Sequence, residues 1–196
     1  MTKKKSYVSV RDRRNDWNGV LGNKKGKDGF TMETRKVKAK PLSLEAFKDY
    51  GTYADMMNPR GYYLEGEYHK FYRDRIRFPA TPQTFCCSSL TVRKNEEFIV
   101  KGMEYHDYTA EIQMPMDADV VLVCAPPNGG EIAAREAEAF LIPKGTMVCL
   151  HPGTWHDVLY PVDSEQASIL IGLPERIYHN DIVVKNFEDC VVQVEF

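Results

Sequence analysis

The chain has 196 residues, of which 43% are apolar and 11% aromatic, enough for a single domain with a hydrophobic core. Its formal net charge is −2, its N-terminus lacks an apolar signal core, and no run approaches the roughly 18 apolar residues of a membrane span. Five cysteines without CxxC spacing favour buried, reduced thiols over disulfides. We therefore expect a soluble, cytoplasmic protein that makes no membrane contact.

The charge is unevenly distributed along the chain. Residues 1–40 hold 13 Lys/Arg against 4 Asp/Glu, whereas the remaining residues hold 13 against 24. Residues 1–35 show no sustained hydrophobic period, which predicts a basic N-terminal arm ahead of a domain at 36–196. No aromatic residues interleave with these cations, so we expect no nucleic-acid partner. The arm is expected to pack on the acidic body or on a second subunit.

The pattern of the domain itself is that of an all-β protein. Residues 36–51 predict a short strand and a helix, with Ser43 as N-cap, Leu44 and Phe47 on one face and Gly51 as the stop. Residues 61–74 are typical of a hairpin, and residues 129–140 fit either a helical turn or a long loop. Short β-branched segments predict further strands at 83–93, 96–106, 110–116, 119–126, 139–150, 156–162, 167–174 and 189–196. Strands at this spacing indicate a sandwich or barrel.

Two histidines flank a Pro-Gly break in the stretch LHPGTWHDVL, residues 150–159. Pro and Gly exclude a helix, and the β-branched flanks indicate strands. A hairpin with residues 152–155 as its loop would set His151 and His156 opposite each other on one face. Such a pair could share a proton, a ligand or a metal. Alternatively, the two histidines could belong to a structural turn without any role in a site.

A second stretch, GMEYHDYTAEIQMP at residues 102–115, offers partners for these histidines. Glu104 and His106 are two apart, so on a strand they point the same way. Glu111 follows His106 after four residues, and a loop at 107–110 would turn it back toward His106. Brought together with His156, these residues form a mixed nitrogen and oxygen site. Such a set suits a divalent transition metal, or a general acid and base without one.

Other polar side chains are candidates for contact with a small-molecule substrate. His151 and Trp155 lie in the same loop as His156, although a loop-capping role and a packing role are the simpler alternatives. Gln113 and Tyr160 could point into the barrel or belong to its wall. His69, in the predicted hairpin, is expected either to line the barrel mouth or to lie on the surface.

The spacing E-x-H-x4-E followed by G-x7-G-x2-H at residues 145–156 resembles the two cupin motifs, with Glu104 in the place of the usual first histidine. Three segments are similar to the ureidoglycolate lyase (ureidoglycolate hydrolase) family of this superfamily. AKPLSLEAFKDYG resembles PLT-x-EAF-x-x-YG, EYHDYTAEIQMPM resembles ERHPLGSQAFIPL, and LHPGTWHDVL resembles YHRGTWHHPL. The family has Gln in the place of Glu111, and Arg and His in the places of Pro152 and Asp157.

The resemblance implies a cupin-like β-barrel of the RmlC-like jelly-roll type, with one short N-terminal helix and the basic arm added. It implies a C–N lyase that releases urea and glyoxylate from ureidoglycolate in purine and allantoin breakdown, assisted by a divalent metal such as Zn, Mn, Ni or Fe. Glu104, His106, Glu111 and His156 would be both the metal ligands and the catalytic groups. Cupins commonly pair, so a homodimer is expected. Another metal-dependent cupin enzyme, such as a sugar isomerase or dioxygenase, and a non-catalytic small-molecule-binding cupin remain the alternatives.

Overall fold

The structure is a computed structural model that describes residues 33–78 and 83–196. The expected basic arm falls mostly on residues 1–32, which lie outside the described residues. The described part begins directly with strand β1 (Glu33–Lys38), which includes the last residues expected in the arm. No helix in the described part is long and apolar enough to span a membrane.

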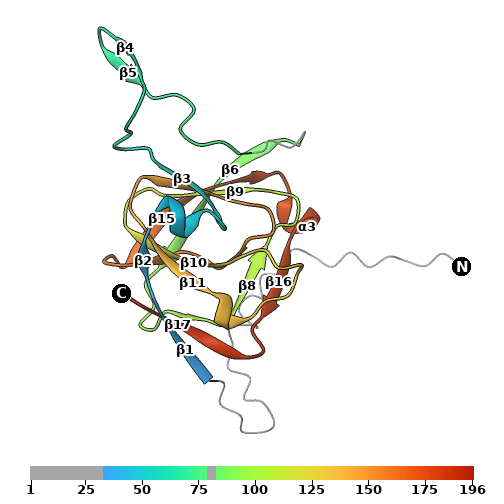
Figure 1. Ribbon diagram of the computed structural model, residues 1–196. Coiled ribbons are helices and arrows are strands. Elements are labelled where there is room, and N and C mark those ends of the chain that lie inside the picture. Colours follow the sequence, from blue (N-terminus) through green and yellow to red (C-terminus); the bar gives the residue numbers. More distant parts are fainter. Residues whose placement is uncertain (1–32, 79–82) are drawn as a thin grey trace, which may run out of the picture. The chain divides into compact units, whose positions relative to one another are not determined.

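The body is built from three sheets (Figure 1). The central sheet has the order β16-β8-β13-β10-β11-β2, with β14 also paired to β10. Its strands are β2 (Lys40–Pro41), β8 (Gly102–Tyr105), β10 (Val120–Ala125), β11 (Glu138–Ile142), β13 (Trp155–His156), β14 (Tyr160–Pro161) and β16 (Val183–Asn186). The outer sheet has the order β3-β12-β9-β15-β6 and consists of β3 (Gly51–Asp55), β6 (Phe85–Arg93), β9 (Glu111–Pro115), β12 (Thr146–Leu150) and β15 (Gln166–Pro174). A small sheet joins β1 to β17 (Cys190–Glu195) and β7 (Ile99–Val100).

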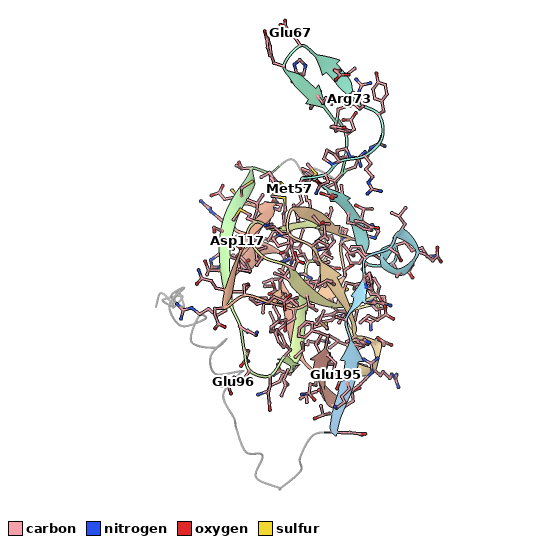
Figure 2. The ribbon with its side chains drawn as sticks, turned by 90° about the vertical axis from the view of Figure 1, so that its left-hand side faces the viewer. Met57, Glu67, Arg73, Glu96, Asp117 and Glu195 are labelled. Atoms are coloured by element: carbon pink, nitrogen blue, oxygen red, sulfur yellow. The ribbon has the colours of Figure 1, made fainter. Side chains whose placement is uncertain are left out.

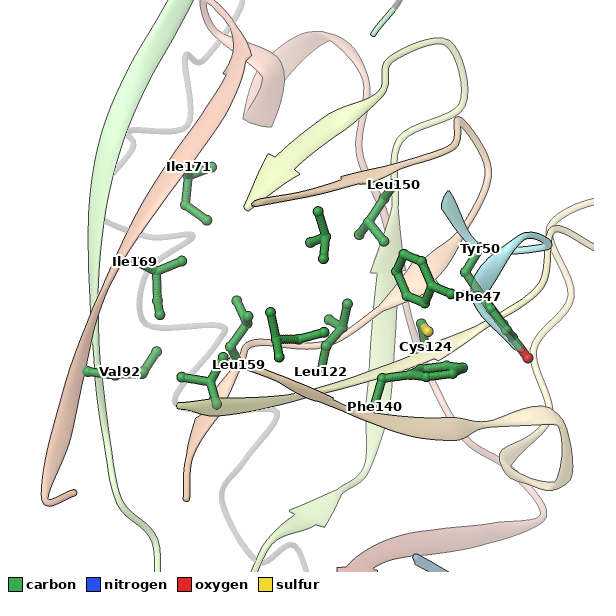
Figure 3. Packing of buried hydrophobic residues seen from close by; sticks show 14 of the residues in the cluster. Phe47, Tyr50, Val92, Leu122, Cys124, Phe140, Leu150, Leu159, Ile169 and Ile171 are labelled. Carbon is green, nitrogen blue, oxygen red and sulfur yellow. The ribbon is translucent and has the colours of Figure 1, made fainter. Parts of the chain in front are cut away.

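Strand β10 shows how the three sheets stack. All six of its residues are buried, as expected for an apolar strand covered on both faces. Leu122 and Cys124 pack into the cluster shared with the outer sheet, which Figure 3 shows. Val121 and Val123 pack into the cluster shared with the small sheet. The central sheet is therefore the middle layer, with one hydrophobic core on each side.

Helix α2 (Leu44–Phe47) closes one end of the first core. The side-chain oxygen of Ser43 accepts a hydrogen bond from the N–H of Ala46 at 3.1 Å, which confirms the predicted N-cap. Phe47 is fully buried, with its ring centroid 5.1 Å from that of Phe140 and 6.0 Å from that of Tyr50 (Figure 3). This one-turn helix is held by burial of its single aromatic anchor, because so short a helix is not stable by itself.

Strands β4 (Leu64–Gly66) and β5 (His69–Phe71) confirm the hairpin predicted near residues 61–74. Among the described residues they pair only with each other, and Figures 1 and 2 draw them away from the three stacked sheets. Tyr68 is 89% exposed and Phe71 is 55% exposed. The hairpin therefore carries large aromatic side chains outside both cores.

The all-β class is confirmed, and the helical content is small. Besides α2 the described residues contain the one-turn helix α3 (Ile177–Asn180), which was not predicted, and the short 3-10 helix η1 (Ala134–Glu136) within the ambiguous stretch. All five cysteines are free, but only Cys124 and Cys149 are buried, and Cys87 is exposed. The expectation of buried thiols thus holds for Cys124 and Cys149 and fails for the cysteines of the edge strand β6 and for Cys190 on β17.

Replacing Phe47 by Ala is expected to lower the free energy of unfolding by about 3–5 kcal/mol, because a buried aromatic ring leaves a cavity. The matched control is Leu44→Ala in the same helix, where the side chain is 75% exposed and the expected change is within about 0.5 kcal/mol. Urea denaturation of both variants measures the difference. Equal losses would contradict the assignment of Phe47 as the anchor of α2.

Candidate metal and catalytic site

The two polar motifs lie on connections between sheets. Strand β8 belongs to the central sheet and β9 to the outer sheet, and these strands do not pair with each other. The same is true of β12 and β13, which flank the Pro-Gly turn. The hairpins predicted around the loops at 107–110 and 152–155 are therefore wrong, because each connection crosses from one layer to the next. The prediction failed because a local pattern shows where strands end but not which strands they pair with.

These crossings bring the four expected side chains into the space between the central and outer sheets. His156 pairs directly with Glu104 across β13 and β8, and directly paired residues share a face. Its partner on the other side is Cys124, which faces the outer sheet. Glu111 lies on the outer sheet and is 5% exposed, and His106, just after β8, is 2% exposed. The side chains thus come from two facing layers.

The carboxylate of Glu111 is the centre of the cluster. Its Oε2 lies 3.0 Å from Nε2 of His106 and 3.0 Å from Nε2 of His156. Its Oε1 accepts a hydrogen bond of 2.9 Å from Nε2 of Gln113. Glu104 is held more loosely, with Oε1 3.7 Å from Nε2 of His156. One buried carboxylate therefore organises two imidazoles and an amide.

Backbone carbonyls orient both imidazole rings. Nδ1 of His106 donates to the carbonyl oxygen of Asp181 at 2.5 Å, and Nδ1 of His156 donates to that of Thr154 at 3.0 Å. Because each Nδ1 carries its hydrogen toward the backbone, each Nε2 is aimed at the cluster. This is the arrangement in which a histidine presents one nitrogen to a metal or a substrate.

The Pro-Gly turn joins the two halves of the site. Gly153 has a φ of +82°, in the left-handed region that favours glycine. Its N–H donates to the carbonyl of His106 at 2.7 Å. The hydroxyl of Thr154 donates to the carbonyl of Tyr50 at 2.9 Å, and this buried bond fixes the turn against the end of α2. The stretch HPGTWH thus holds the cluster residues in place and also supplies one of them, His156.

Burial and charge shift the pKa of each cluster residue. Burial opposes the charged form of His156, but the charge and hydrogen bond of Glu111, with the charge of Glu104, outweigh it and raise the pKa to about 9. Burial also opposes the charged form of His106, but the hydrogen bond and the charge of Glu111 outweigh it, so the pKa of His106 is raised. Burial of Glu111 is outweighed by the two histidines, so its pKa is lowered. Burial raises the pKa of Glu104, which the charge of His156 only partly offsets.

Asp181 supports the site although sequence reasoning missed it. Besides its carbonyl bond to His106, its carboxylate accepts from the N–H of Asp107 at 2.7 Å and of Tyr108 at 3.0 Å, and from the hydroxyl of Thr109 at 2.8 Å. These bonds hold the crossing between β8 and β9. Asp181 is more than 70 positions away in the chain, so no local spacing marks it.

Tyr178 on α3 is a second residue that the sequence did not mark. Partial burial, together with the charges of Glu111 and Glu104, raises the pKa of its phenol to about 12. The residue nevertheless remains 57% exposed. Tyr178 therefore lies at the rim of the site, within electrostatic reach of both carboxylates, and stays protonated near neutral pH.

The remaining expected contact residues lie in different places. Gln113 is in the cluster, bonded to Glu111. Trp155 is fully buried but faces the opposite core, because it neighbours His156 on the same strand and successive side chains alternate. Tyr160 also packs toward that core, and its hydroxyl donates to the carboxylate of Asp157. Trp155 and Tyr160 are thus beside the cluster in sequence but on the other face of the central sheet.

Two of the expected histidines are exposed and outside the cluster. His151 has an exposed side chain, and its N–H donates to the carbonyl of Tyr50 at 2.9 Å. It therefore contributes to the turn through its backbone. His69 lies on β5 of the exposed hairpin, paired with Gly66. The structure does not bring either side chain to the cluster.

The four cluster residues fit a metal ion. Glu104, His106, Glu111 and His156 each offer one donor atom, and these atoms all lie within 4.8 Å of one another. Two imidazole nitrogens with two carboxylates are a donor set for divalent transition metals. The carbonyls behind both Nδ1 atoms are the outer contacts that such ligands normally have. The group could thus bind a metal, as its residue types indicated.

The mostly antiparallel sheets, with a His/Glu group between the central and outer sheets, are the arrangement expected of a cupin-type protein. The family model described as ureidoglycolate lyase matches residues 34–195. The chain therefore belongs to the ureidoglycolate lyase family, which confirms the resemblance of its motifs. No curated protein matches the chain.

Solved structures similar to the chain include two sugar-nucleotide enzymes. A dTDP sugar isomerase from Desulfovibrio desulfuricans G20 has 8% identity and a TM-score of 0.45, over 71% of this chain and 84% of that chain. The dTDP-6-deoxy-D-glucose-3,5-epimerase of Legionella pneumophila has 12% identity and a TM-score of 0.41, over 67% and 75%. Bacillus subtilis oxalate decarboxylase has 15% identity and a TM-score of 0.37, over 52% of this chain. The chain spans 24% of that decarboxylase chain.

In the metal-free protein, stability is expected to fall as pH rises from about 6.5 to 9. The folded-state pKa of His156, about 9, lies above the ordinary value of 6.5, so its contribution is complete below pH 6.5 and is lost as pH rises through 9. His106 acts in the same direction. The free energy of unfolding, measured by urea titration after chelation, should drop by on the order of 1–3 kcal/mol.

The matched variants for this pH profile are Glu111→Gln and Glu97→Gln. The first removes the anion that raises both imidazole pKa values and should flatten the profile in this window. The second removes an exposed carboxylate and should leave the profile unchanged. The same slope in all three proteins would contradict the charge pattern of the cluster.

Proposed function

We propose that the protein is a ureidoglycolate lyase-type C–N lyase, which releases urea and leaves glyoxylate. The observation that carries this proposal is the buried Glu111 cluster in a chain that belongs to the ureidoglycolate lyase family. A cluster of carboxylates and imidazoles suits a substrate that must lose one proton and regain another.

Glu104, His106, Glu111 and His156 would hold a divalent metal ion. When bound, the ion would neutralise the carboxylate of the substrate and polarise the carbinol oxygen. Glu111 is the ligand best fixed in place, because both of its oxygens are already hydrogen-bonded. Glu104, with one longer contact to His156, is the ligand that is freest to move.

Glu104 is the group best placed to act as base. Burial raises the pKa of this carboxyl above its ordinary value, which makes the carboxylate a stronger base. It takes the proton of the carbinol hydroxyl, the O–H electron pair forms the aldehyde C=O, and the C–N bond breaks. The departing nitrogen keeps the electron pair of that bond and takes the proton from the Glu104 carboxylic acid, which gives urea and restores the carboxylate.

Glu111 and His106 are less suited to donate this proton. The pKa of Glu111 is lowered by the two histidines, so Glu111 stays ionised. His106 has both ring nitrogens engaged, Nδ1 with the carbonyl of Asp181 and Nε2 with Glu111. Tyr178, protonated at the rim, can donate a hydrogen bond to the departing urea.

Purified protein incubated with ureidoglycolate is expected to release urea and glyoxylate in equal amounts. Glu104→Gln should lower kcat by about 10²- to 10⁴-fold, the usual contribution of a positioned proton-transfer group. His69→Ala, on the exposed hairpin, should retain the activity of the unmodified protein. Absence of urea release by folded, metal-loaded protein would refute the proposed reaction. An unchanged kcat in Glu104→Gln would refute the role of Glu104.

Metal content tests the ligand set separately from turnover. After equilibration with divalent ions and desalting, the protein is expected to retain about one ion per chain, as the cluster of four donors in the described residues implies. Glu111→Ala and His156→Ala should each weaken binding by at least about 10- to 100-fold. His151→Ala, beside the same turn but exposed, should bind as the unmodified protein does. Elemental analysis measures all four, and equal retention would contradict the assigned ligands.

A further inference from the structure

Gln113 has an unusual position for an amide side chain. It follows Glu111 by two residues on β9, so both side chains point from the outer sheet toward the central sheet. Gln113 is 2% exposed and is therefore more deeply buried than Glu104, which is partly exposed. A buried amide requires partners for both its oxygen and its nitrogen.

The orientation of this amide is fixed by its neighbour. Nε2 of Gln113 donates to Oε1 of Glu111 at 2.9 Å. The reverse orientation would place the amide oxygen against a carboxylate oxygen, and neither atom could donate. The amide oxygen must therefore point away from Glu111.

The described part of the chain places no donor at that oxygen. Within residues 33–78 and 83–196, Oε1 of Gln113 is buried and has no hydrogen-bond partner. Its directly paired neighbours are Val148 on β12 and Ile171 on β15, both apolar and both part of the core. Figure 3 shows Ile171 within that core. Neither of these two neighbours can donate to the acceptor, so among the described residues the oxygen stays free to accept a hydrogen bond from a ligand.

The unmet acceptor is directly coupled to the cluster. The carboxylate of Glu111 holds both histidines with Oε2 and Gln113 with Oε1. A ligand group bonded to Gln113 would therefore lie one hydrogen bond away from the cluster. A hydroxyl O–H or an amide N–H can donate a hydrogen bond to this oxygen, whereas a methyl group cannot and would leave it unpaired.

We propose that Oε1 of Gln113 accepts a hydrogen bond from an amide or ureido N–H of the ligand, and so makes the site select carboxylates that carry such a group. The carboxylate half of this ligand rests on the proposed function. The N–H half rests on the orphaned oxygen alone. Gln113 is then a specificity-determining residue: it rejects a methyl-bearing analogue because that analogue leaves a buried acceptor without a partner.

Oxamate and pyruvate are the probes that isolate this contact, because they differ in an amide NH₂ against a methyl group. Calorimetric titration of the full-length protein is expected to show about 3- to 10-fold tighter binding of oxamate, the effect of one neutral hydrogen bond. In Gln113→Leu the ratio of the two affinities should fall to about one. Met114→Leu, whose side chain points the other way from the same strand, should keep the ratio.

The ratio separates the acceptor role from a structural one. If Gln113→Leu merely loosens Glu111, both probes lose affinity together and the ratio stays unchanged, which would overturn the proposal. Equal affinities in the unmodified protein, as expected if a trapped water satisfies Oε1, would overturn it too, as would absence of oxamate binding. Because no turnover is measured, a preference for oxamate that depends on Gln113 would stand even if ureidoglycolate were not cleaved.

Discussion

The site depends on one buried anion. Oε2 of Glu111 lies 3.0 Å from an imidazole nitrogen on either side, in a space that water reaches poorly. A buried carboxylate is costly without partners, and here the two histidines lower its pKa despite its burial. The dependence is mutual, because the same charge raises the pKa of both histidines. Removing any one member leaves an uncompensated buried group, so the three act as a unit.

The scaffold is arranged to hold this unit from two layers. The central sheet contributes His156 and Glu104 as a direct cross-strand pair, and the outer sheet contributes Glu111. Hydrogen bonds then tie the crossings together: Gly153 binds the carbonyl of His106, and Asp181 binds both that imidazole and the crossing before β9. Rigid strands with bonded loops hold side chains closely enough for metal binding or proton transfer.

The two glutamates have different environments, and this divides their roles. Glu111 is surrounded by donors and stays ionised, whereas Glu104 has one longer contact and a pKa raised by burial. Two carboxylates whose pKa values are pushed apart are a common basis for separate structural and acid–base roles. Gln113 adds a third element, a buried acceptor that no group within residues 33–78 and 83–196 satisfies.

Local pattern was enough for the all-β class, the α2 cap at Ser43 and the residue types of the cluster, since strand alternation, capping and ligand chemistry depend on neighbours in the chain. It failed on the pairing of strands: β8 and β9 lie in different sheets, as do β12 and β13. That difference made the turn at Gly153 a crossing between layers, whereas Trp155 faces the other core because it alternates with His156 along β13. Asp181 and Tyr178 could not be found from spacing, because their contacts to the cluster form only when segments about 70 residues apart meet. The sequence by itself determined the chemistry available. Tertiary structure decided which groups share the buried space, because burial and proximity across sheets, which set every pKa in the cluster, are properties of packing.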